Sequence, residues 1–140
     1  MAKRTIWAIV AVFVAWSILD FILHGLLLRS TYEATANLWR PMDQMNMPLM
    51  YFVTLVFTAC FVLIYGHLVG QKSLASGIRF GALFGLATGI SMGFGSYTYM
   101  PIPLVLAWSW FLGSWIEAVT AGAIVGAMMK SSDSLDRKPN

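Results

Sequence analysis

The chain has 140 residues, of which 59% are hydrophobic and 11% are charged, and its mean hydropathy is +0.72. Soluble domains carry about 25% charged residues, so the charges here are too few to coat a soluble surface. With a single cysteine, Cys60, and a net charge of +3 from basic residues that flank apolar runs, the composition excludes a soluble enzyme, a nucleic-acid-binding module, a disordered chain and a disulfide scaffold.

Four apolar runs predict an all-α, polytopic membrane protein with four transmembrane helices. The runs cover residues 6–28, 48–69, 77–99 and 104–129, and each approaches the roughly 20 residues that cross a bilayer. They form a single domain over residues 1–130, followed by a polar cytoplasmic tail over 131–140. The first run follows Lys3 and Arg4 as a signal peptide would, but it exceeds the roughly 7–15 residues of a signal core, so we expect a retained helix.

The segment after the first run contains a helix signal. Ser30 and Glu33 have the spacing of a capping box, and Pro41 ends the stretch that follows. We therefore predict a short interfacial helix at about residues 31–39, lying along the membrane surface. An irregular loop is the alternative.

The basic residues predict the orientation of the four helices. Of the 9 Lys and Arg residues, only Arg29 and Arg40 lie in the segments after the first and third runs. Because Lys and Arg are enriched on the cytoplasmic side of membrane proteins, both termini are expected there, which is an N-in, C-in topology.

Glycine recurs every four residues along the third run, and a shorter stripe follows in the fourth. So many glycines would weaken a helix in water, but in lipid they let a second helix approach closely. The stripe predicts tight packing inside the bundle; a docking groove for a partner or a second copy is the alternative. Since a four-residue step winds around the helix, the stripe could serve two neighbours. Its members are Gly77, Gly81, Gly85, Gly89 and Gly93, with Gly122 and Gly126 in the fourth run.

Polar side chains from all four runs fall at nearly one depth. Counted at about 1.5 Å per residue, Asp20, Thr58, Ser91 and Glu117 lie about 18–21 Å from the cytoplasmic helix ends. His24 follows Asp20 by one turn, on the same face. Ionisable residues inside a membrane are functional candidates because they are costly there. The layer could be a proton or cation path, a hydrogen-bonded clasp that fixes helix register, or a contact with a partner subunit.

Four methionines precede or begin the second run: Met42, Met45, Met47 and Met50. Thioethers suit Cu(I), but methionine is also a flexible apolar filler, and copper is the weaker interpretation. The chain has no ligand spacing typical of zinc or haem, so we expect no metal site and no cofactor.

Three stretches resemble a group of small bacterial inner-membrane proteins of unknown function. They are LDFILHG at residues 19–25, LWRPM at 38–42 and MPIP at 100–103. The resemblance covers nearly the whole chain and implies four membrane helices in a bacterial inner membrane. It supplies no catalytic or ligand residue.

These patterns favour an accessory or structural membrane subunit that docks with a larger membrane complex or self-associates, through its glycine stripe and aromatic faces. Its expected partners are the bilayer and a membrane protein or a second copy, and no nucleic acid. The alternative is a small proton- or cation-coupled transporter or channel that uses Asp20, His24 and Glu117. Without a nucleotide-binding loop or a nucleophile constellation, the chain is not expected to be an enzyme.

Overall fold

The structure, a computed structural model, describes residues 2–130, and this part of the chain is helical with no strand. Its long helices are α1 (Ala2–Asp20), α3 (Met47–Leu68), α4 (Leu74–Ile90) and α5 (Leu104–Met128). Short π-helical segments, η1 (Phe21–Leu27) and η4 (Ser91–Gly95), continue α1 and α4. Each of the four resulting rods is long and apolar enough to cross a membrane, which confirms the four predicted spans to within a few residues. The predicted tail over 131–140 lies outside the described residues.

Local capping sets where two of the helices begin. The Asn46 side chain accepts a hydrogen bond from the Leu49 amide at 3.0 Å, and Pro48 lies in the first turn of α3, where its missing N–H costs nothing. Ser73 and Ser76 form a reciprocal capping box that starts α4. The helix therefore begins at Leu74, three residues before the start at residue 77 that the apolar run predicted.

The segment after η1 is helical, but it is built differently from the prediction. The short helix α2 (Arg29–Ala34) is followed by the 3-10 turns η2 (Ala36–Leu38) and η3 (Met42–Gln44). The predicted capping box is wrong, because Glu33 pairs with Arg29 at 2.9 Å and Ser30 makes no capping bond. The physical reason is the position of the helix start: Leu28, at the bend between η1 and α2, is the N-cap residue, so Ser30 falls inside the first turn.

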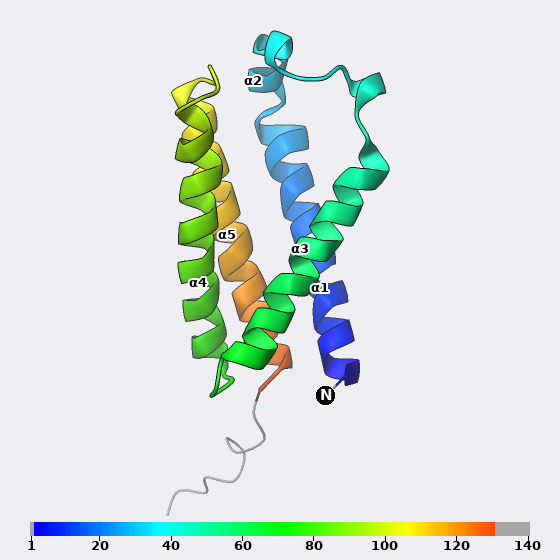
Figure 1. Cartoon of the computed structure of the whole chain (residues 1–140), viewed down its shortest axis with the longest axis vertical. Helices are drawn as coiled ribbons and strands as arrows, with labels where there is room; N and C mark the ends of the chain where they lie inside the picture. The colour runs from blue at the N-terminus through cyan, green and yellow to red at the C-terminus, as the bar shows by residue number, and fades with distance from the viewer. Residues whose placement is uncertain (1, 131–140) are drawn as a thin grey trace, which may run out of the picture.

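Three of the rods pack along their length, and α3 leans away from them. In Figure 1, α4 and α5 run side by side, α1 lies behind, and α3 crosses toward α4 only near the N-terminal end of the bundle. The buried residues of α3 all come from its second half: Thr58, Phe61, Val62 and Tyr65. We call the opposite end of the bundle, which holds α2 and the 96–103 turn, the α2 end.

The glycine stripe of α4 is buried against α5 along its whole length. A Cβ added at Gly81 would lie 2.2 Å from the Ala118 carbonyl oxygen, and one at Gly93 would lie 2.3 Å from that of Ala107. All five glycines of the stripe are buried. The stripe thus meets one neighbour inside the chain, not two, and leaves no glycine free for a partner. It follows α5 because that helix presents its own small residues at the same spacing, Ala118, Gly122 and Gly126.

Candidate functional site

Asp20, His24 and Glu117 come together near the middle of the bundle, where α1 and η1 pack against α5. His24 Nε2 lies 3.8 Å from Asp20 Oδ1. The side chains of Asp20 and Glu117 are close enough to interact electrostatically.

Two contacts hold α1 against α5 on either side of this pair. Trp16 Nε1 donates to the backbone carbonyl of Glu117 at 2.7 Å. One turn before Glu117, Gly113 presents no side chain, and Leu23 of η1 occupies the space where a Cβ would stand. The two acids meet because a tryptophan bond and a missing side chain fix the two helices at this level.

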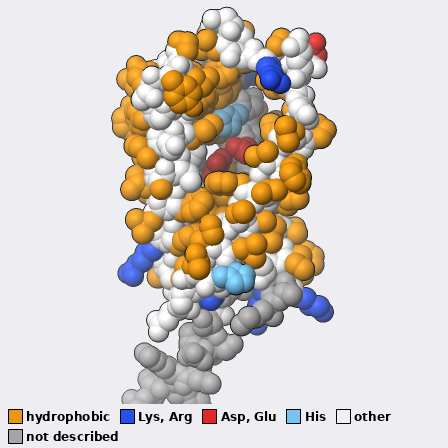
Figure 2. All heavy atoms as spheres, viewed as in Figure 1, with side chains coloured by type: hydrophobic (Ala, Val, Ile, Leu, Met, Phe, Trp, Pro, Cys, Tyr) orange, Lys and Arg blue, Asp and Glu red, His pale blue; other side chains and the backbone are white. Residues whose placement is uncertain are grey.

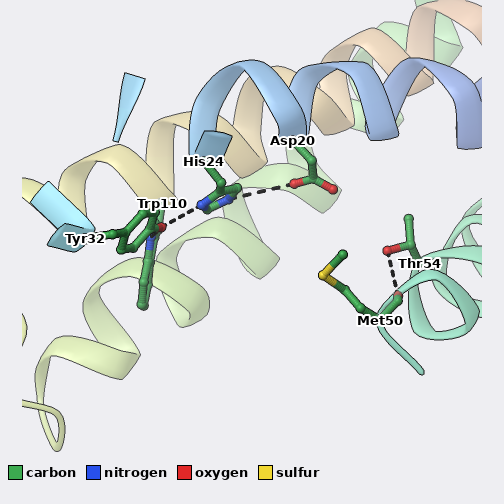
Figure 3. A network of polar contacts seen from close by, with 6 residues as sticks. All are labelled: Asp20, His24, Tyr32, Met50, Thr54 and Trp110. Carbon is green, nitrogen blue, oxygen red and sulfur yellow. Dashed lines mark hydrogen bonds and ion pairs between the residues drawn. The ribbon is translucent and has the colours of Figure 1, made fainter. Parts of the chain in front are cut away.

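A chain of polar contacts runs from the acids toward the α2 end (Figure 3), and hydrogen bonds link its members His24, Tyr32 and Trp110. The Trp110 indole donates to the Tyr32 hydroxyl at 2.7 Å, and that hydroxyl lies 2.6 Å from His24 Nδ1. An indole N–H can only donate, so the Tyr32 oxygen accepts from Trp110 and its hydrogen is free to donate to Nδ1. A neutral His24 then carries its own hydrogen on Nε2, which faces Asp20.

Tyr32 lies in α2, outside the four spans, and it is partly buried between His24 and Trp110. Burial raises the pKa of its phenol, and the nearby Asp20 charge acts in the same direction. The Trp110 hydrogen bond opposes them by stabilising the phenolate. At neutral pH the phenol keeps its hydrogen, as the bond to His24 requires. Sequence spacing gave no signal for Tyr32 or Trp110, since the two are 78 positions apart.

Three buried side-chain oxygens near this level receive no hydrogen bond from the described chain: Ser17 Oγ, Thr58 Oγ1 and Glu117 Oε1. Thr54, Thr88 and Thr120, by contrast, each donate to the carbonyl four residues earlier. That bond is the usual arrangement for a threonine inside a helix. Thr58 departs from it although its side chain is fully buried.

Ser91 does not belong to the polar layer, which corrects the prediction that every helix contributes to it. Its side chain is exposed. Ser91 lies two residues from Gly89 and Gly93, both buried against α5, and two residues turn a helix by about 200°. Ser91 therefore lies at the depth of the polar layer but on the face of its helix that points away from α5.

The cluster opens sideways between α3 and α4. The side chains of Asp20 and His24 are 45% and 40% exposed. Figure 2 shows acidic and histidine side chains in a hollow between hydrophobic walls, and Figure 3 shows Thr54 across from Asp20. We call this hollow the α3–α4 cleft, with Asp20 and His24 on its floor and Thr54 on its α3 wall. It narrows where Phe57 contacts Trp16 and Phe84, at centroid distances of 5.5 and 5.7 Å.

The opposite side of the cluster, toward the N-terminal end, is closed by an apolar core. The core side chains there are fully buried and pack together: Ala8, Val12, Phe61, Val62, Ala121 and Val125. The acids are thus reached from the cleft and the α2 end, and they are separated from the N-terminal end by packed hydrocarbon.

The residues of the described chain offer little for a transition metal. No group of three His, Cys, Asp or Glu side chains within residues 2–130 could hold a metal ion. Met42, Met45, Met47 and Met50 are all exposed and spread over η3, the turn after it and α3. The structure thus adds no support to the copper interpretation.

No family model, curated protein or solved structure matches this chain. The chemistry of the cluster therefore has to be inferred from its own residues.

Proposed function

We propose that this chain is a small integral membrane protein that exchanges protons or other cations at the Asp20–His24–Glu117 cluster, as a small cation-coupled transporter. The observation that carries the proposal is the partial exposure of Asp20 and His24 in the α3–α4 cleft, within the first membrane span. A charged side chain that faces acyl chains is costly, by about 2.5–3.5 kcal/mol or more at the centre of a span. Water or cations in the cleft would avoid that cost.

The chain of polar contacts supports the same proposal. Asp20 lies 3.8 Å from His24, and His24 is hydrogen-bonded to Tyr32, so a small movement of the His24 ring gives a proton a route between the acids and the α2 end. We adopt the N-in, C-in orientation in a bacterial inner membrane, because the basic residues and the resemblance favour it. The cleft then opens in the outer half of the bilayer, and the apolar core closes the cytoplasmic half.

One-sided access means that transport requires a second conformation. The second half of α3 packs on the core, whereas the residues of its first half are exposed except for Thr54. A tilt of α3 toward the cleft, alone or against a second copy, would close the outer side. This is the movement that the proposal needs.

Proton flux into liposomes tests the proposed function. The protein is reconstituted with a pH-sensitive dye inside, and flux is driven by a potassium diffusion potential. We expect flux above that of protein-free liposomes, and its loss in Asp20→Asn and Glu117→Gln. Glu33→Gln is the matched control, because Glu33 is an exposed acid that pairs only with Arg29 on the surface. Unchanged flux in both cluster variants, with the fold intact, would refute the proposal.

The accessory-subunit role remains a second candidate, favoured by the exposed first half of α3. The glycine stripe of α4 is buried, so a docking partner would have to contact α3 and the cleft instead. Mass measurement after purification in a gentle detergent separates the two roles. A different protein that co-purifies favours the accessory role, and a defined homo-oligomer favours transport.

A further inference from the structure

The three buried oxygens without a donor lie at one level of the bundle. Trp16 places them there, because its ring contacts both Phe57 and Phe61 of α3, at 5.5 and 5.4 Å, and its indole bonds to the Glu117 carbonyl. Ser17 follows Trp16 directly, and Thr58 lies between the two phenylalanines. The level of Ser17, Thr58 and Glu117 is therefore fixed by contacts between α1, α3 and α5.

These oxygens also lie on the faces that surround Asp20. Ser17 precedes Asp20 by three residues, which puts both on one face of α1. Thr58 follows Thr54 by one turn, and Thr54 faces Asp20 across the cleft in Figure 3. Glu117 meets Asp20 directly. Three helices thus direct oxygen atoms toward the base of the α3–α4 cleft.

We propose that this level is a binding site for one small alkali cation such as Na⁺, with oxygen ligands from Ser17, Asp20, Thr58 and Glu117. The inference rests on the proposed function and names the cation that the cluster exchanges. Hydroxyl and carboxyl oxygens are the ligands of hard cations, and the set includes no sulfur or imidazole.

Charge and energy agree with a monovalent ion. A buried oxygen without a hydrogen-bond partner is costly, and one bound cation would give a partner to Ser17, Thr58 and Glu117 at once. The surrounding side chains are largely apolar, and a monovalent ion brings the smallest charge into such a surrounding.

The affinity of the purified protein for ²²Na⁺ tests the site, at constant chloride concentration with choline as the replacement cation. We expect one Na⁺ per chain and a rise in thermal midpoint of about 9 °C when Na⁺ exceeds its dissociation constant a hundredfold. Ser17→Ala and Thr58→Val should each weaken Na⁺ binding at least about tenfold, because each removes one ligand from a small set.

Ser91→Ala serves as the matched control, because it removes an exposed serine at a similar depth. It should not change Na⁺ affinity. In choline alone, Thr58→Val should be at least as stable as the wild type, since it removes a buried hydroxyl without a partner. A stable Thr58→Val protein that binds Na⁺ weakly has lost a ligand for the ion and has not lost its fold.

Absence of Na⁺ binding, or an equal loss of affinity in Ser91→Ala, would overturn the cation site. The proposed function is tested separately. If no Na⁺ binds but proton flux in choline buffers depends on Asp20 and Glu117, the proposed function stands and the cation site is wrong. If Na⁺ binds but no flux is seen, the site stands and the transport proposal is wrong.

Discussion

The seam between α4 and α5 allows one prediction to be worked out from distances. Substituting Gly81 with alanine adds a Cβ that would stand 2.2 Å from the Ala118 carbonyl oxygen and 3.1 Å from the Gly122 Cα. Favourable carbon contacts lie at about 3.5 Å or more, so the helices must separate by about 1 Å. The obstacle is backbone, which cannot rotate out of the way.

Separation by this amount removes much of the attraction across the seam. A gap of about 0.5–1 Å forfeits a quarter to a half of each contact energy, and overpacking of this kind costs about 1–3 kcal/mol. In water, alanine is more favourable in a helix than glycine by about 1 kcal/mol. Helix propensity therefore offsets part of the packing loss and cannot be its cause. The difference between these two terms is a net loss of about 1 kcal/mol in the free energy of unfolding for Gly81→Ala.

Unfolding by sodium dodecyl sulfate in mixed micelles, followed by circular dichroism, measures this loss. Gly70→Ala is the matched control, because Gly70 lies in the bend between α3 and α4 with nothing within 4 Å of an added Cβ. It should change stability by less than about 0.5 kcal/mol. A Gly81→Ala protein as stable as the wild type would refute the reasoning. The reasoning would also be refuted if Gly81→Ala abolished dimerisation but left the stability of the monomer unchanged.

Three further predictions concern the contacts that position the cluster and start α4. Gly113→Ala should reduce proton flux, because the added Cβ meets the Leu23 side chain and pushes η1 away from α5. Adding Leu23→Ala removes that side chain and should restore the flux. Failure of the double variant to recover flux would contradict this account. Trp110→Phe should raise the pKa of Tyr32 further, since the hydrogen bond that opposes burial is lost. Alkaline absorbance titration measures this, with Tyr32→Phe identifying the Tyr32 contribution, and a lowered pKa would be evidence against the bond. Ser73→Ala removes the cap of α4 and should lower stability by about 1 kcal/mol in micelle unfolding. Ser30 makes no capping bond, so an equal loss in Ser30→Ala would contradict the role of Ser73.

The sequence by itself determined the four spans, because the thickness of the bilayer and the hydrogen bonding of a helix constrain contiguous residues. It also indicated the close approach of α4 to another helix, since a glycine every fourth residue has an effect that is local to one helix face. Asp20 and Glu117 stood out for the same reason: each is an acid inside an apolar run, whatever its neighbours.

Only the tertiary structure decided which faces meet. Depth can be counted along a helix, but rotation and tilt come from packing, so Ser91 points away from the cluster while Ser17 and Thr58 lie at its level. The lean of α3, which leaves Asp20 open to a cleft, has no local signal in residues 47–68. Tyr32 and Trp110 join the site across 78 positions, and a bond of that range depends on how whole helices are placed in space.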